Sequence, residues 1–351
     1  MKTIRLFALL TALMMLLTVP AFAELLDSLP MDDYSIGPAP KIEHYVFSDD
    51  PGEIDAVQEI GGSKYRAACA YEDPSISVKI YAGRFATGGR NGETDYVAAL
   101  VKISHPSQLR TASAGMSSAK AQYNPKGSFK SNGTLRGRLI AKAVNAVVSI
   151  NGDYYTKVKE HCKVVLRQST QVRNLADEQA HDLLVIDKNG DFSVLSQPDT
   201  AAYTAFYKEN ANSLYQVLCF DPVLIKDGEI QIDETYWNPR ISKRIDTRAQ
   251  RSAIGQMGPL EYLLVTCSSP DTPKNDGMTV YEFAQLCQDL SRRIAPETGC
   301  RLMYNLDGGA STTLNFLGYS KAKNSYNMMK INNPSDERFL SDIIYFATLE
   351  K

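Results

Sequence analysis

Alternating apolar and polar positions from residue 71 onward predict a domain built from strands. Ile76, Val78 and Ile80 alternate with polar residues, which is typical of a strand with one buried face. The continuous apolar run at 260–267 predicts a central strand that is buried on both faces. Further apolar runs predict strands at residues 96–103, 145–150 and 301–306.

Short polar turns join some of these strands as hairpins. The apolar run 183–186 leads through an Asn-Gly turn at Asn189-Gly190 into 192–195, and Asn-Gly tolerates the backbone angles of a tight hairpin. An Asp-Gly turn at Asp227-Gly228 joins 223–225 to 230–232 in the same way. The acidic spacing of the first turn resembles half a calcium loop, but the remaining ligands are missing, so a simple turn is expected.

Helices are fewer than strands. Thr279 and Glu282 have the spacing of a capping box and predict the start of a helix, and Pro296 and Gly299 end it. Apolar residues recur at helical spacing inside it: Val280, Phe283, Ala284, Cys287, Leu290 and Ile294. A shorter helix is expected near 139–144. This mixed order predicts an α+β fold, a single domain built on a mixed, mainly antiparallel sheet with a few packing helices.

The N-terminal 65 residues have a different pattern. Lys2 and Arg5 precede an apolar run, and Ala21-Phe22-Ala23 offers the small residues of a signal-peptidase site. The run is shorter than the roughly 20 apolar residues that span a bilayer, so residues 1–23 are expected to be a signal peptide, without stable membrane insertion. Residues 24–65 are acidic and interrupted by prolines, which predicts an arm or linker before one domain at 66–351. We therefore expect a secreted, extracellular protein, either free or associated with the cell wall.

Charge and cysteine content narrow the function classes. The formal net charge is −2 and no block of like charge occurs, which argues against a nucleic-acid partner. Six cysteines in an exported chain permit disulfides. However, Cys219 and Cys267 lie in apolar runs and Cys287 lies on an apolar helix face, so buried free thiols are favoured. The chain has no C-x-x-C and its four histidines are scattered, so neither a metal site nor a cofactor is expected.

Three glycine-containing turns at the ends of buried strands collect polar side chains. They are Ile150-Asn151-Gly152-Asp153-Tyr154-Tyr155, Arg251-Ser252-Ala253-Ile254-Gly255 and Asn305-Leu306-Asp307-Gly308-Gly309-Ala310-Ser311-Thr312-Thr313. Glycines let the backbone approach a ligand closely, and consecutive exposed amides can bind an anion. Asn, Asp, Arg and hydroxyl side chains suit a sugar or a phosphate. Each turn alone is ordinary turn chemistry, but all three end apolar runs of one core and are expected to meet.

These segments, in this order, resemble the phosphodiester glycosidase family. The likeness runs from residue 71 to the C-terminus through further matching segments: Tyr71-Glu72-Asp73-Pro74-Ser75-Ile76, Leu109-Arg110-Thr111-Ala112, Phe220-Asp221-Pro222-Val223-Leu224, Lys226-Asp227-Gly228 and Glu337-Arg338 onward to Phe346. The chain departs from the family at Asp153-Tyr154-Tyr155, where many relatives have a second glycine and aromatics, and at Arg167-Gln168-Ser169, where relatives often have Arg-Asn-Gly. The resemblance implies a hydrolase that cleaves a sugar from a sugar-1-phosphodiester in a glycan or exopolysaccharide.

The resemblance also implies roles for the polar residues. Asp307 is the first candidate for acid/base or nucleophile and Asp153 the second, because glycosidases use two carboxylates. Arg251 is the candidate ligand of the phosphate. The other candidates for substrate binding are Asn151 and Asn305 for sugar hydroxyls, and Gly308, Gly309, Ser311 and Thr312 for the anion. If the strands at 147–151 and 302–306 are central in one sheet, then Asp153, Arg251 and Asp307 should line one pocket.

Two other functions fit the same residues. One is a glycoside hydrolase acting on phosphate-free exopolysaccharide, and the other is a non-catalytic protein that binds cell-wall glycan. A serine hydrolase is disfavoured, because the chain has no G-x-S-x-G motif. Release of sugar from a sugar-1-phosphodiester would separate these functions.

Overall fold

A computed structural model describes residues 65–67, 70–114, 134–153, 165–167, 170–173, 181–236, 247–320, 325–332 and 337–349. All of them belong to one compact unit that spans Ile36–Lys351. The predicted signal peptide at 1–23 and the predicted arm up to residue 64 lie outside the described residues.

The largest sheet has eight strands in the order β14-β13-β17-β15-β16-β4-β3-β2. Its strands are β2 (Ala70–Glu72), β3 (Ile76–Ala86), β4 (Glu93–Ile103), β13 (Val223–Lys226), β14 (Glu229–Ile230), β15 (Ser252–Gly258), β16 (Glu261–Cys267) and β17 (Leu302–Leu306). The predicted central strand is confirmed, because β16 lies between β15 and β4. The predicted hairpin at Asp227-Gly228 is confirmed as well, since β13 pairs with β14 around it.

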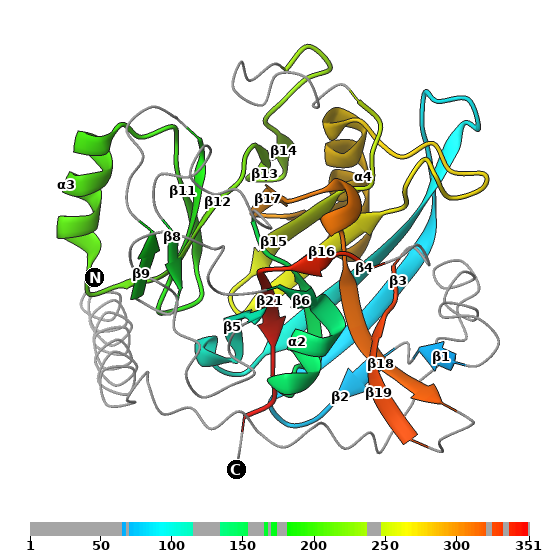
Figure 1. Cartoon of the computed structure of the whole chain (residues 1–351). Coiled ribbons are helices and arrows are strands. Elements are labelled where there is room, and N and C mark those ends of the chain that lie inside the picture. Colours follow the sequence, from blue (N-terminus) through cyan, green and yellow to red (C-terminus); the bar gives the residue numbers. More distant parts are fainter. Residues whose placement is uncertain are drawn as a thin grey trace, which may run out of the picture. The chain divides into compact units, whose positions relative to one another are not determined.

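A second sheet has six strands in the order β1-β18-β7-β21-β5, with β19 paired to β18. Its strands are β1 (Tyr65–Ala67), β5 (Leu109–Ser113), β7 (Val148–Asn151), β18 (Leu314–Ser320), β19 (Ser325–Lys330) and β21 (Asp342–Phe346). Helix α2 (Gly137–Ala143), close to the predicted helix at 139–144, contacts β7, β19 and β21. Figure 1 shows it beside β21.

A third sheet has five strands in the order β11-β10-β12-β8-β9. Its strands are β8 (Val165–Arg167), β9 (Thr170–Arg173), β10 (Leu183–Asp187), β11 (Phe192–Leu195) and β12 (Leu214–Cys219). The predicted hairpin around Asn189-Gly190 forms β10 and β11, with Gly190 at a φ of 82°. Helix α3 (Thr200–Asn210), which was not predicted, begins after the N-cap Asp199 and buries Tyr203 against this sheet. Two short strands, β6 (Leu135–Arg136) and β20 (Phe339–Leu340), also pair with each other.

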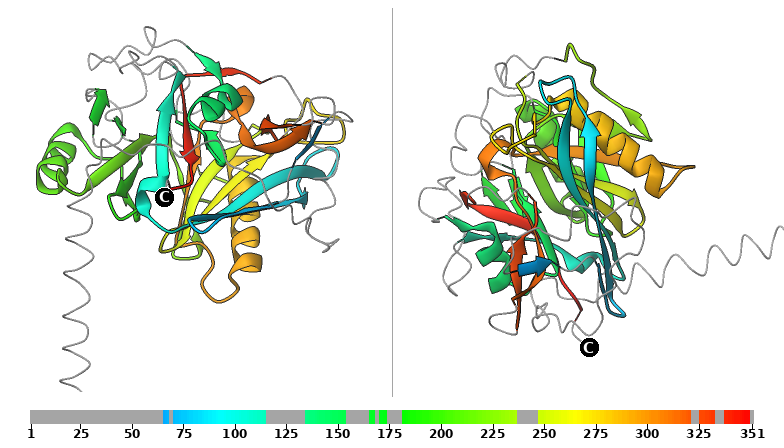
Figure 2. Two further views of the ribbon diagram at one scale, coloured as in Figure 1. Left: turned by 90° about the horizontal axis from the view of Figure 1, so that it is seen from below. Right: turned by 90° about the vertical axis from the view of Figure 1, so that its right-hand side faces the viewer.

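Two cores cover the two faces of the eight-stranded sheet. Side chains alternate along β16, so Leu264 packs in the core shared with the six-stranded sheet, and Leu263 and Val265 pack in the other core. The second core is closed by helix α4 (Val280–Ile294), which has the predicted Thr279–Glu282 capping box. Figure 2 shows α4 and the six-stranded sheet on opposite sides of the eight-stranded sheet.

The predicted α+β fold of mainly antiparallel strands with a few helices is confirmed, and every strand pairing among the described residues is antiparallel. One expectation about the sheet is wrong. Strands β7 and β17 do not lie in one sheet, because β7 pairs with β18 and β21 whereas β17 pairs with β13 and β15. The reason is that a strand buried on both faces has the same apolar sequence pattern in either of two sheets that pack face to face. The pattern therefore does not indicate which sheet the strand joins.

The cysteines of the described residues agree with the expectation of buried thiols. Cys219, Cys267, Cys287 and Cys300 are buried and form no disulfide among the described residues. Cys69 and Cys162 lie outside the described residues. None of the helices in the described part of the chain is both long and apolar enough to cross a membrane.

Candidate active site

The turn after β17 carries Asp307 and crosses from the eight-stranded to the six-stranded sheet, where β18 begins at Leu314. Gly308 is required there because a Cβ would lie 2.9 Å from the Gln250 carbonyl oxygen. Gly309 adopts a φ of 58°, which favours glycine, and its amide donates to the Gln250 carbonyl (2.8 Å). The amide of Gly309 is therefore already paired and is not placed to bind an anion.

Arg251 lies next to Asp307 at the start of β15. Ser252 pairs with Leu306, and continuing this antiparallel register places Arg251 opposite Asp307. The buried guanidinium donates from Nε to the Met278 carbonyl (3.0 Å) and from Nη2 to the Thr247 carbonyl (2.5 Å). Burial lowers the pKa of Arg251 to about 10. The side chain therefore remains a cation at neutral pH, which suits an anionic substrate.

Asp307 is half-buried, and its carboxyl group has a raised pKa. Its Oδ2 is buried and has no hydrogen-bond partner among the described residues. Burial raises the pKa of Asp307 to about 7, although the Ser311 hydroxyl and the Arg338 charge oppose the shift and the Asp153 charge adds to it. A carboxyl group that titrates near neutral pH can both donate and accept a proton in a reaction.

Asn151 joins the strand ends that form the site. Its Nδ2 donates to the carbonyl of Asp307 (2.7 Å), although β7 and β17 belong to different sheets. Its Oδ1 accepts from the Ser252 hydroxyl (2.8 Å) and from the Thr313 amide (3.1 Å). The side chain thus fixes β7, β15 and the Asp307 turn relative to one another, and its amide group is occupied by these contacts.

Asp153 is held in a buried ionic network. Arg167 Nη2 lies 3.0 Å from Asp153 Oδ1 and 2.9 Å from Asp342 Oδ2, and the exposed fractions of the three side chains are 2%, 0% and 3% respectively. The Cys219 amide donates to the other oxygen of Asp153 (3.1 Å). Gly152 has no side chain because Asp342 occupies the space that a Cβ would need. The structure thus gives Asp153 an anchoring role between sheets as well as electrostatic influence on Asp307.

Three of the predicted residues have buried polar atoms without a hydrogen-bond partner among the described residues. These atoms are Asp307 Oδ2, Asn305 Oδ1 and Thr312 Oγ1. Asn305 is held from its other end, because its Nδ2 donates to the carbonyl of Asp221 (2.8 Å). Unpaired buried polar groups are rare in folded proteins and are often completed by a ligand or water. Hydroxyl groups of a sugar could pair with all three atoms.

Sequence reasoning assigned no role to Arg338, which the structure brings to the Asp307 turn. Its Nη1 donates to the Ser311 hydroxyl (3.2 Å), and its charge opposes the raised pKa of Asp307. Arg338 belongs to a matching segment near the C-terminus, but no local spacing connects it with Asp307.

A cluster around Asp221 was also missed. Asp221 adopts a φ of 88°, which is uncommon for any residue but glycine, and its Oδ2 lies 3.7 Å from His181 Nδ1. Neither ring nitrogen of the buried His181 has a hydrogen-bond partner among the described residues. Burial and the neighbouring Asp221 raise the pKa of Asp182 to about 6. The Tyr304 hydroxyl donates to the Asp182 carbonyl (2.6 Å) and so joins this cluster to β17.

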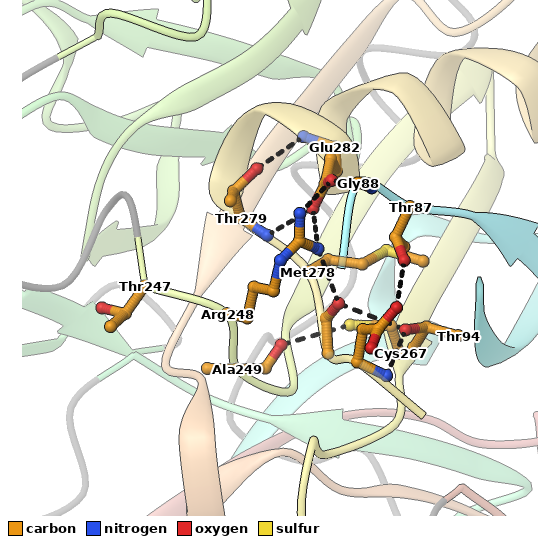
Figure 3. A network of polar contacts seen from close by, with 12 residues as sticks. Thr87, Gly88, Thr94, Thr247, Arg248, Ala249, Cys267, Met278, Thr279 and Glu282 are labelled. Atoms are coloured by element: carbon orange, nitrogen blue, oxygen red, sulfur yellow. Dashed lines mark hydrogen bonds and ion pairs between the residues drawn. The ribbon is translucent and has the colours of Figure 1, made fainter. Parts of the chain in front are cut away.

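The segment that precedes β15 is tied to the start of α4. Figure 3 shows Arg248 pointing at Glu282, with distances of 2.6 Å from each terminal guanidinium nitrogen to a carboxylate oxygen. Ala249 and Met278 form an isolated β-bridge beside this ion pair. Over the described ranges, no group of three or more His, Cys, Asp or Glu side chains could hold a metal ion.

Comparisons with known proteins identify the family and the fold of this chain. A family model described as phosphodiester glycosidase matches residues 144–347, which is more than half of the sequence and includes β7, β15 and β17. No curated protein matches the chain.

A solved structure of a catalytic domain shares the fold of this chain. The catalytic domain of zebrafish N-acetylglucosamine-1-phosphodiester alpha-N-acetylglucosaminidase, auto-inhibited by its pro-peptide, aligns with 91% of this chain and 99% of its own length, at 18% identity and a TM-score of 0.54. A hypothetical protein from Synechocystis aligns with 77% of this chain and 62% of its own length, at 14% identity and a TM-score of 0.47. The match of the family model over residues 144–347 shows that the chain belongs to the phosphodiester glycosidase family and is a glycosidase that acts on phosphodiester-linked sugars.

Proposed function

We propose that this glycosidase is secreted and removes a sugar from sugar-1-phosphodiesters in glycans or exopolysaccharides outside the cell. The single observation that carries the chemistry is the presence of an acid and a cation on adjacent strand ends of the β15–β17 ladder. Burial raises the pKa of Asp307 to about 7, and its Oδ2 has no hydrogen-bond partner among the described residues. The backbone of Arg251 lies opposite Asp307 in the register that continues from Ser252 and Leu306. Secretion is supported by the signal-peptide pattern of residues 1–23.

The reaction breaks the bond between the anomeric carbon and the phosphate oxygen and adds water at that carbon. The products are the free sugar and a phosphate monoester, so one water molecule is consumed. A phosphate monoester leaves as an anion, and Arg251 would stabilise the charge that develops on it. Because the leaving group is already anionic, the reaction would need a cation that binds the phosphate more than a second strong acid.

Asp307 would transfer the proton in this reaction. Its protonated form would donate to the leaving phosphate, and its ionised form would accept a proton from water or attack the anomeric carbon. Arg338, through the Ser311 hydroxyl, would hold the turn that positions Asp307. Asn305 Oδ1 and Thr312 Oγ1 would accept hydrogen bonds from sugar hydroxyl groups.

Asp153 would support the site without transferring protons. Its carboxylate is paired with Arg167 and with the Cys219 amide, and its side chain is fully buried. Protonation would break a buried ion pair, which is strongly unfavourable. We therefore assign Asp153 to holding the Asn151–Gly152 turn, from which Asn151 reaches the Asp307 carbonyl.

A panel of sugar-1-phosphodiesters with different sugars, assayed by phosphorus NMR, tests the proposal. We expect the diester signal of at least one compound to be replaced by a monoester signal together with free reducing sugar. Cleavage of neutral aryl glycosides without any phosphodiester would favour a hydrolase of phosphate-free exopolysaccharide. Glycan binding without cleavage of either class would favour a binding protein.

Secretion needs a separate test in the source cells. We expect the protein in the culture medium or cell-wall fraction to begin at Glu24, as read by N-terminal sequencing. Retention of the intact N-terminus in the cytoplasmic fraction would contradict this part of the proposal.

A further inference from the structure

An ion pair outside the predicted site joins α4 to the segment that carries Arg251. Arg248 donates from both terminal nitrogens to the two oxygens of Glu282, each at 2.6 Å, which makes the pair bidentate. The side chains of this pair are 27% and 14% exposed. The Arg293–Asp289 pair on the same helix is 46% and 47% exposed. Arg248 and Glu282 are therefore less screened by solvent than an ordinary surface ion pair.

The Glu282 carboxylate holds three parts of the chain at once. It accepts hydrogen bonds from Arg248, from the Thr279 amide at the start of α4 (3.0 Å), and from the Gly88 amide in the β3–β4 turn (2.8 Å). Burial works against ionisation, but these donors keep the pKa of Glu282 below its usual value. Figure 3 shows Thr279, Gly88 and Arg248 converging on this side chain.

The residues around Arg248 supply the carbonyl groups that hold Arg251. Thr247 accepts from Arg251 Nη2, and Ala249 forms two backbone hydrogen bonds with Met278, whose carbonyl accepts from Arg251 Nε. Gln250 accepts from the Gly309 amide in the Asp307 turn (2.8 Å). A shift of the 247–250 segment would therefore move the guanidinium of Arg251 and the Asp307 turn together.

We propose that Arg248 and Glu282 are positioning residues that set the orientation of Arg251 for phosphate binding. The proposal rests on the proposed function, in which Arg251 binds the phosphate of the substrate. Arg248 acts through the carbonyls of its neighbours in sequence, and Glu282 acts through Arg248. The alternative is that the ion pair only stabilises the start of α4, and the two roles predict different measurements.

The experiment compares Arg248→Ala, Arg248→Lys and Glu282→Gln with the wild-type protein. The readouts are the dissociation constant of inorganic phosphate, measured by calorimetry, and kcat and KM on a cleaved sugar-1-phosphodiester. We expect Arg248→Ala to weaken phosphate binding about fivefold to thirtyfold and to raise KM by a similar factor, because charge-assisted hydrogen bonds of Arg251 are misaligned. Glu282→Gln should have a smaller effect in the same direction. Arg248→Lys should recover part of the loss, since lysine keeps the charge but not the bidentate geometry.

Two matched variants separate positioning from stability. Thr279→Ala removes the side-chain cap of α4 but keeps the backbone amide that binds Glu282, so it should lower the melting temperature and leave phosphate affinity unchanged. Arg293→Ala removes an exposed ion pair of the same helix and should change neither quantity. Phosphate affinity that falls equally in Thr279→Ala and Arg248→Ala would overturn the positioning role.

Arg251→Ala distinguishes this proposal from the proposed function. If Arg251→Ala loses phosphate affinity and Arg248→Ala binds phosphate like wild type, only the positioning role is wrong. If Arg251→Ala itself binds phosphate like wild type, Arg251 is not the phosphate ligand and both proposals fall. If Arg251→Ala and Arg248→Ala both lose phosphate affinity, and Arg248→Lys has an affinity between those of Arg248→Ala and wild type, the result supports both proposals.

Discussion

At the scale of single residues, Asp307 is the residue to which we assign proton transfer. The substitution Asp307→Asn keeps the size of the side chain but cannot carry a titrating proton. We expect kcat to fall on the order of 10²–10⁴-fold, the usual contribution of a general acid or base. Asp289→Asn, in an exposed ion pair of α4, is the control and should retain full activity. Retention of more than a tenth of the activity in Asp307→Asn would remove Asp307 from proton transfer.

The same substitution should change how stability depends on pH. Burial raises the pKa of Asp307 to about 7 in the folded protein, above an unfolded value of about 3.9. Protonated Asp307 therefore favours the folded state below pH 4, and this contribution is lost as the pH rises through 7. We expect the melting temperature of Asp307→Asn, relative to wild type, to increase between pH 4 and pH 7 and to stay constant above pH 8. A constant difference over the whole range would show that Asp307 is ionised normally.

Arg167 compensates two buried carboxylates, so its removal should be costly. Arg167→Met leaves Asp153 and Asp342 buried without their cation, and we expect a loss of about 3–5 kcal/mol in the free energy of unfolding measured with urea. Arg293→Met, which breaks an exposed pair, should cost about 0–1 kcal/mol. Equal losses in the two variants would mean that the Arg167 network is not an anchor.

The sequence indicated candidate site residues that lie in local motifs, and it did not indicate residues that contact these motifs from distant parts of the chain. Asp307, Arg251 and Asn151 are predicted site residues because they lie in glycine-containing turns at strand ends. Arg338 could not be predicted, since it reaches Ser311 from 27 positions away along the chain. The pairing of Asp153 was equally hidden, because Arg167 and Asp342 belong to strands whose neighbours depend on non-local contacts.

At the scale of elements, the Asp307 turn depends on the close approach of Gly308 to the preceding segment. Gly308→Ala would bring a Cβ within 2.9 Å of the Gln250 carbonyl, so we expect the turn to shift and kcat/KM to fall at least about tenfold. The control is Gly258→Ala at the end of β15, where nothing lies within 4 Å of the added Cβ. Normal activity of Gly308→Ala would show that the turn tolerates displacement.

Elements with strong local sequence patterns were predicted well, but the strands with which they pair were not. Helix α4 was predicted because its capping box and apolar spacing are local, as were the hairpins at Gly190 and Gly228. Helix α3 was missed, although Asp199 caps it through the Ala202 amide (2.7 Å). Local patterns could not predict how the strands are divided among the sheets. Strands β7 and β17 are both buried on both faces, so the periodicity of their side chains does not indicate their neighbours.

At the scale of the whole molecule, stability should not depend on disulfides among the described cysteines. Burial raises the pKa of the Cys267 and Cys300 thiols to about 12, so they stay protonated and unreactive. We expect reductant to change the melting temperature by less than about three degrees, and alkylation of Cys219, Cys267, Cys287 and Cys300 to require denaturant. A loss of about ten degrees in reductant would indicate a stabilising disulfide elsewhere in the chain.

The bond that the enzyme breaks tests the central claim most directly. A cleaved sugar-1-phosphodiester is hydrolysed in water enriched in oxygen-18, and both products are analysed by mass spectrometry and phosphorus NMR. A glycosidase that uses Asp307 and Arg251 as proposed adds water to the anomeric carbon. We predict the label in the free sugar at the earliest times, before anomeric exchange, and an unlabelled phosphate monoester. Label in the phosphate monoester would show attack at phosphorus and would contradict glycosidic cleavage at this site.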